Sequence, residues 1–160
     1  MAKLFESSDY VVEMVKEEFA NCGLESYGLN LKVISTVKSK DIITANKASA
    51  TTEFVSKQEG MIIVTVYEKA FERLDTEDKQ KLFIEAALSA VSFDSEKDKI
   101  NIEKNQAVIL HNMRHKYDNN ILDILELNQI IIQQIDEEEK AEKEAKKQER
   151  LEKRLNKQKI

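Results

Sequence analysis

Apolar side chains recur at helical spacing near the start of the chain. Val11, Val15 and Phe19 lie four residues apart, with Val12 and Met14 beside them. This spacing places them on one face of an amphipathic helix. Two serines just before this stretch can cap the start of the helix, and a glycine after it can end the helix in a left-handed conformation. We therefore expect a helix from about residue 9 to residue 22.

Four later segments have the patterns of strands. Residues 29–37 alternate between apolar and polar positions, which is typical of a strand with one buried face. The nearly continuous apolar run from Met61 to Tyr67 indicates a central strand buried on both faces. Between them, a stretch rich in Thr, Ser, Ala and Val predicts a strand around residues 50–55. Residues 99–104 alternate again, and we expect them to form a hairpin with Ser92 and Phe93 across a polar turn.

The second half of the chain is dominated by helical patterns. A short helix is expected over residues 69–74, followed by one that Asp75 can cap. From Leu82 to Val91 this second helix is apolar almost all round, which is typical of a helix packed on several sides. Residues 106–117 predict a further helix, and residues 121–135 a Leu- and Ile-rich one. The fold class is therefore α+β, a small mixed sheet packed by helices on one side.

The last 25 residues form a separate, highly charged segment. We divide the chain into an α+β domain, residues 1–135, and a charged helical tail, residues 136–160. Acids precede bases by four residues in the tail, the order that stabilises a helix. Its first ten residues carry six acids and two bases, and its last fifteen carry two acids and seven bases. This distribution complements the helix dipole. The pairs of an acid and a base four residues later are Asp136/Lys140, Glu139/Lys143, Glu142/Lys146 and Glu149/Lys153.

Charge limits the classes of partner. Residues 1–135 carry sixteen bases and twenty-two acids, a net charge of −6, whereas residues 136–160 carry nine bases and eight acids, a net charge of +1. An acidic domain disfavours nucleic-acid binding, which usually requires a basic stripe. Three interpretations of the tail remain: a solvated spacer helix, a helix that docks on a protein partner, or a nucleic-acid contact through its basic end, residues 146–159. The oligomeric state is left open.

Other sequence features limit cofactors and location. The three glycines are too far apart for a phosphate-binding loop, and we expect no cofactor. A single cysteine, Cys22, cannot form an internal disulfide, and we expect it to be buried on the first helix. The N-terminal residues do not have the apolar stretch of a signal peptide. No apolar run is long enough to cross a bilayer, so we expect neither secretion through a signal peptide nor membrane insertion.

Two groups of polar residues are candidates for chemistry. His111, His115 and Asp118 share one helix face and could hold a divalent metal. The residue after the first histidine is Asn112, where a zinc peptidase has its glutamate base, so a solvated histidine pair and an adventitious metal are the alternatives to a functional site. Glu85 and Ser89 form the one polar stripe of the most apolar helix. Glu85 therefore lies at a rim, bonds to a structural partner, or faces a cleft.

The run from Leu82 to Asp94, followed by residues 96–102, resembles a group of bacteriophage proteins similar to the phage metallopeptidases, which are small zincin-like domains. In that family a helix with the motif His-Glu-x-x-His precedes an aspartate and a short charged hairpin. Here the motif is degenerate. One alignment places it at Glu85-Ala-Ala-Leu-Ser89, and the other at residues 86–90, Ala-Ala-Leu-Ser-Ala. Both put alanine at the general-base position, and neither supplies a histidine.

The resemblance implies a zincin-like shape without peptidase chemistry, because catalytic zinc requires about three protein ligands and an activated water. We expect a non-enzymatic phage protein, virion-associated or a host-takeover accessory, located in the host cytoplasm or the virion. It would bind a protein partner through its acidic domain and charged tail. The alternatives are a hydrolase with an unconventional site around Glu85, with or without a metal at the two histidines, and a nucleic-acid accessory protein.

Overall fold

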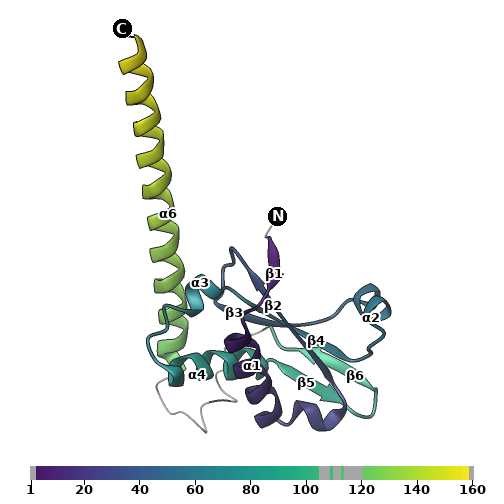
Figure 1. The fold of residues 1–160 in the computed structure, drawn as a ribbon. Helices are drawn as coiled ribbons and strands as arrows, with labels where there is room; N and C mark the ends of the chain where they lie inside the picture. Colours follow the sequence, from purple (N-terminus) through teal and green to yellow (C-terminus); the bar gives the residue numbers. More distant parts are fainter. Residues whose placement is uncertain (1–2, 105–108, 110–112, 114–120, 159–160) are drawn as a thin grey trace.

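The computed structural model describes residues 3–104, 109, 113 and 121–158 of the 160-residue chain and shows an α+β fold. Its centre is a four-stranded sheet with the order β1-β2-β4-β3 (Figure 1). The two inner strands are parallel to each other, and each edge strand is antiparallel to its neighbour. The sheet is therefore mixed, as the sequence predicted. Its strands are β1 (Leu4–Glu6), β2 (Asn30–Thr36), β3 (Ile43–Lys47) and β4 (Met61–Val66).

One face of this sheet forms the core. The side chains on this face are apolar, except for that of Ser35, which is polar and fully buried. Helices α1 (Asp9–Asn21) and α4 (Glu77–Leu88) contact each other and pack against strands β2 and β3, respectively. The opposite face is more polar, with Lys32 exposed. This alternation explains why the helices gather on one side. The inward residues of the strands are Leu31, Val33, Ser35, Ile43, Ala45, Ile62, Val64 and Val66.

Several elements agree with the sequence patterns. α1 begins within a residue of its predicted start, and Gly23 follows it with a φ of +74°. β2 and β4 cover the predicted strands, and β4 lies between two neighbours, as a central strand should. The hairpin is present as β5 (Val91–Asp94) and β6 (Lys99–Ile102), with Ser92 opposite Asn101. Strong periodic patterns were thus sufficient for these elements.

The strand predicted around residues 50–55 is wrong. That segment is the helix α2 (Ala50–Ser56), and the strand lies earlier, at β3. The reason is local, because the Ser49 side chain accepts a hydrogen bond from the Thr52 backbone N–H at 3.2 Å and starts a helix. Two buried residues of β3, Ile43 and Ala45, pair instead with β4.

The boundaries around the apolar helix also differ from those predicted. α4 ends at Leu88, and Val91 already belongs to β5. Thr76, not Asp75, caps its start by accepting from the Lys79 N–H, while Asp75 binds the Lys79 ammonium at 2.7 Å. Two further short helices are present: the 3-10 helix η1 (Leu24–Tyr27), which follows α1, and the helix α3 (Glu68–Phe71), which lies between β4 and α4.

Two N-terminal features were not anticipated. β1 is a three-residue edge strand whose residues are all exposed, so it shows no burial pattern that a sequence could reveal. Cys22 is exposed, contrary to the expected burial. It follows the last residue of α1, directly before Gly23.

The C-terminal helix α6 (Ile121–Gln158) is 38 residues long and continues through the predicted start of the tail. Its first half packs through Ile124, Ile131 and Ile135, which are all buried. From Lys140 to Asn156 every residue is exposed, and this part projects away from the sheet (Figure 1). None of the described helices combines the length and the apolar character that a membrane-spanning segment requires.

Candidate functional site

The polar residues singled out in the sequence do not meet in one described site. His111, His115 and Asp118 lie outside the described residues. Glu85 faces α1 from α4 and lines a surface pocket of about 550 Å³ together with Glu18 and Lys81. The Ser89 hydroxyl donates to the Glu85 carbonyl oxygen at 2.7 Å, which occupies it at the end of the helix. Glu85 and Ser89 therefore do not form a nucleophile–base pair.

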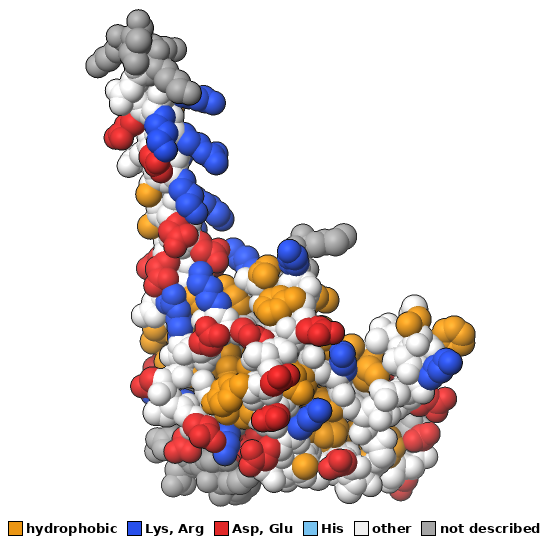
Figure 2. All heavy atoms as spheres, in the orientation of Figure 1, with side chains coloured by type: hydrophobic (Ala, Val, Ile, Leu, Met, Phe, Trp, Pro, Cys, Tyr) orange, Lys and Arg blue, Asp and Glu red, His pale blue; other side chains and the backbone are white. Residues whose placement is uncertain are grey.

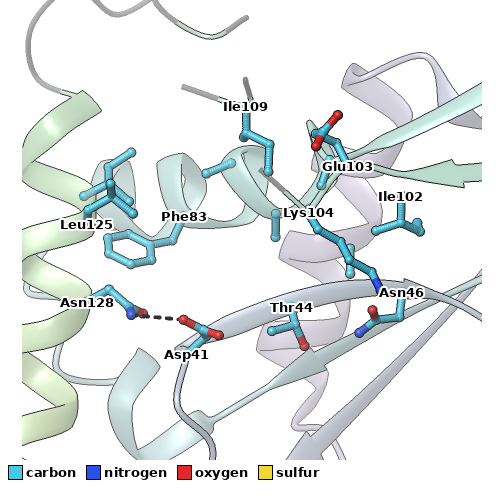
Figure 3. A pocket seen from close by; sticks show the side chains of 15 residues that line it. Asp41, Thr44, Asn46, Phe83, Ile102, Glu103, Lys104, Ile109, Leu125 and Asn128 are labelled. Atoms are coloured by element: carbon cyan, nitrogen blue, oxygen red, sulfur yellow. Dashed lines mark hydrogen bonds between the residues drawn. The ribbon is translucent and has the colours of Figure 1, made fainter. Parts of the chain in front are cut away.

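The opposite side of α4 borders a second hollow, which the sequence did not indicate. It has a volume of about 370 Å³ and lies between α4, β3, the end of β6 and the first half of α6 (Figure 3). Phe83 and Leu125 contribute apolar surface, while Thr44, Asn46 and Lys104 provide polar groups at its border. A volume of this order can accommodate a small ligand or an inserted side chain.

Three alanines line this hollow: Ala86 and Ala87 on α4, and Ala90 in the turn that follows it. If residues 86–90 are aligned with His-Glu-x-x-His, the three alanines take the positions of the first ligand, the general base and the second ligand. In the alignment at residues 85–89, the two ligand positions are Glu85 and Ser89, which lie away from the hollow. Only the alignment at residues 86–90 places all three motif positions on this hollow.

A hydrogen-bonded contact closes the hollow beside α6. The Asn128 side-chain oxygen accepts from the Ile42 backbone N–H at 2.9 Å, and its amide nitrogen donates to Asp41 at 3.3 Å. Figure 3 shows Asn128 pointing from α6 toward Asp41. Ile42 is fully buried, so its N–H needs a protein partner. Asn128 thereby fixes α6 to the start of β3, across 86 positions of sequence.

A charge cluster, further along α6, joins the helix to the body of the protein. It comprises three bases of the body, Lys38, Lys69 and Arg73, and three acids of α6, Asp136, Glu138 and Glu139. The two terminal guanidinium nitrogens of Arg73 donate to the two carboxylate oxygens of Glu138, at 3.0 and 2.5 Å. The Lys38–Asp136 and Lys69–Glu139 distances are 3.4 and 3.6 Å. Asp136 and Glu139, which were expected to pair within the helix, thus contact the body.

This cluster shifts the pKa of neighbouring groups. Burial raises the pKa of Tyr67, and the carboxylates of Glu139 and Asp136 raise it further, while Arg73 opposes them. The hydrogen bond from Arg73 holds the pKa of the Glu138 carboxyl below its ordinary value. Tyr67 therefore stays neutral at physiological pH and Glu138 stays ionised, which suits a structural contact. Further out, the predicted Glu149–Lys153 pair is present, at 2.5 Å.

A partly buried polar network lies where β2 and β4 end. Ser35 donates to the Glu68 carboxylate at 2.5 Å and bonds to the Ser7 hydroxyl at 2.7 Å. The Ser8 backbone N–H donates to the same Glu68 oxygen at 2.9 Å. No sequence motif indicates this network, because its members come from three separate segments: the linker before α1, β2 and α3. Its effect is to connect the start of α1 to β2 and α3.

The tip of α2 carries an exposed apolar pair. Phe54 is 84% exposed and Val55 is 75% exposed, more than any other large hydrophobic residues described. The helix is held with this pair outward, because Ser49 caps it and the Glu53 carboxylate accepts from the Met61 N–H at 3.3 Å. Figure 2 shows the hydrophobic side chains over α2 at the far end of the molecule from α6.

The described residues offer no group of three or more His, Cys, Asp and Glu side chains arranged to hold a metal ion. What they offer is an apolar hollow, an exposed apolar tip and a charged helix. No protein-family model, no curated protein and no solved structure matches this chain.

Proposed function

We propose that the chain is a non-enzymatic bacteriophage protein with a degenerate zincin-like domain, and that it acts by binding another protein. The tip of α2 is the main contact surface in this proposal. The partner presents an apolar cleft that receives the Phe54 and Val55 side chains, in the virion or among the proteins of the host cytoplasm.

The orientation of α2 carries the proposal. The helix turns its polar Glu53 toward β4 and its two large apolar side chains toward water. This arrangement is the reverse of the usual surface helix, whose apolar stripe faces the core. Exposed aromatic and aliphatic side chains held on a capped helix suit the centre of a protein interface, where such residues supply much of the binding energy.

The three alanines that line the hollow beside α4 support the part of the proposal that concerns a zincin-like domain. If the helix descends from a His-Glu-x-x-His helix, the three residues that once acted on the metal should border one cavity. Ala86, Ala87 and Ala90 do so. Their methyl groups have no capacity to bind metal or transfer a proton. The hollow is then what remains of an active site, and binding at α2 is a separate property.

Photocrosslinking tests the proposed contact. Benzoylphenylalanine is placed at position 54 of the full chain, which is expressed in infected bacterial cells. The matched control carries it at Tyr10, which is 55% exposed on α1. We expect one discrete adduct from position 54 and none of that mass from position 10. An excess of wild-type chain should suppress the adduct, whereas the Phe54→Ser/Val55→Ser variant should not.

Two results would overturn the proposal. One is the absence of any adduct specific to position 54. The other is equal suppression by the wild type and by the Phe54→Ser/Val55→Ser variant, since this would show that the apolar pair contributes nothing to the contact. Because both residues are highly exposed, the variant should retain the wild-type circular dichroism spectrum.

A further inference from the structure

The bases of the exposed half of α6 gather on one side of the helix. Figure 2 shows Lys and Arg side chains along one flank of the projecting segment. At 3.6 residues per turn, the seven bases between residues 140 and 154 fall within about 140° of arc. The four acids of the same stretch, Glu142, Glu144, Glu149 and Glu152, lie outside that arc. We call the bases the basic stripe: Lys140, Lys143, Lys146, Lys147, Arg150, Lys153 and Arg154.

From this geometry we propose that the basic stripe binds the phosphate backbone of double-stranded DNA without sequence preference. The sequence alone gives the tail a net charge near zero, which hides the stripe. The helix places the positive and negative charges on different sides, so that one flank presents an uninterrupted line of bases about 21 Å long. This line has the electrostatic pattern of a phosphate contact.

The helix dipole does not account for the stripe. A dipole favours bases near the C-terminal end but makes no distinction between sides of the helix. Like charges three or four residues apart, such as Lys143/Lys147 and Arg150/Arg154, destabilise a helix in isolation. A helix built only for solubility would alternate its charges on each flank. The repulsion along this flank is relieved when a polyanion lies against it.

Duplex DNA fits the stripe better than other polyanions. The major groove of B-form DNA is wide enough for an α-helix, whereas that of duplex RNA is too narrow. A helix that binds membranes needs a broad apolar flank. Here the flank opposite the stripe carries three acids, Glu144, Glu149 and Glu152, besides Leu155 and two alanines. The stripe also lies on the part of α6 that projects beyond the acidic body (Figure 1), so the repulsion between the body and the phosphates is reduced.

Fluorescence anisotropy of the purified full chain with a labelled 20-base-pair DNA duplex tests the proposal. We expect saturable binding at 50 mM salt that weakens steeply toward 200 mM. The variant Lys147→Gln/Arg150→Gln/Arg154→Gln keeps good helix formers but removes three charges. Its affinity should fall by about tenfold or more, and the slope of log K against log salt should shrink by about three.

The matched control removes the same number of charges from exposed lysines of the body: Lys16→Gln/Lys32→Gln/Lys99→Gln. It should bind DNA with nearly wild-type affinity and slope. The proposal is overturned if the wild type does not bind duplex DNA at 50 mM salt, or if the control loses as much affinity as the stripe variant. Equal or tighter binding of duplex RNA, or of vesicles with anionic lipids, through the same three residues would also overturn it.

Discussion

The two halves of α6 have similar helical backbones but depend on different interactions. The first half buries Ile124, Ile131 and Ile135 and is joined to the body by Asn128 and by the charge cluster. The second half is exposed at every position from residue 140 to residue 156 and contains the Glu149–Lys153 ion pair within the helix. Isolated pairs of this kind contribute little, about 0.2–0.5 kcal/mol each.

This difference shows that a high charge density does not define the solvated part of a helix. Glu138 and Glu139 belong to the charged segment by composition, yet they contact bases of the body. The change from anchored to exposed helix comes at about Lys140, one turn beyond the last buried isoleucine. We therefore expect substitutions before residue 140 to alter the stability of the whole fold and those after it to alter only the distal helix.

The largest effect is expected at Ile135, which is 1% exposed. The substitution Ile135→Ala leaves a cavity between α6 and the core and should lower the free energy of unfolding by about 2–5 kcal/mol. Leu151→Ala is the matched control, because Leu151 is 49% exposed on the same helix; its effect should stay within about 0.5 kcal/mol. Urea denaturation measures both. Equal losses would show that the two halves do not differ as we describe.

A smaller effect is expected at Asn128. The substitution Asn128→Ala leaves the buried Ile42 N–H without its acceptor, at a cost of about 1–3 kcal/mol. Gln129→Ala changes the exposed neighbour on the same turn and should leave the free energy of unfolding almost unchanged. If the two variants unfold at the same urea concentration, the attachment of α6 to β3 does not depend on this hydrogen bond.

The elements that could be predicted from the sequence are those whose own residues carry a clear period. β2 alternates, α1 repeats every three or four residues, and β4 is apolar along its length, so neighbouring residues were enough to assign them. The strand predicted around residues 50–55 failed because β-branched residues there favoured a strand, while a single serine cap was enough to start a helix.

The features that could not be predicted from the sequence depend on contacts between distant parts of the chain. No local pattern shows that Asn128 accepts from Ile42, or that Glu138 meets Arg73. The hollow beside α4 is equally hidden, because alanine at residues 86, 87 and 90 looks like an ordinary helix former until β3 and α6 surround it. The basic stripe, in contrast, could have been found by placing residues 140–154 on a helical wheel instead of summing their charges.

The smallest of the three effects is expected at the Arg73–Glu138 pair, and its pH dependence separates it from the packing effects. The pKa of Glu138 is lowered in the folded protein from its ordinary value of 4.5 by the hydrogen bond from Arg73. The pair therefore stabilises the fold at neutral pH, and this contribution disappears as the pH falls through the lowered pKa. Arg73→Ala should reduce the free energy of unfolding at pH 7 and have progressively less effect below pH 4.5. High salt should also diminish the difference, because the pair is partly exposed.

Lys153→Ala is the matched control for this measurement, since it removes the base of the Glu149–Lys153 pair from the distal half. Urea denaturation at each pH should find its free energy of unfolding indistinguishable from that of the wild type, because the distal helix can fray without exposing the core. A loss at pH 7 as large as that of Arg73→Ala would mean that the distal half unfolds together with the body. The ion pairs across the interface and those along the exposed helix would then contribute equally to the free energy of unfolding. The boundary near residue 140 would then not separate two parts of different stability.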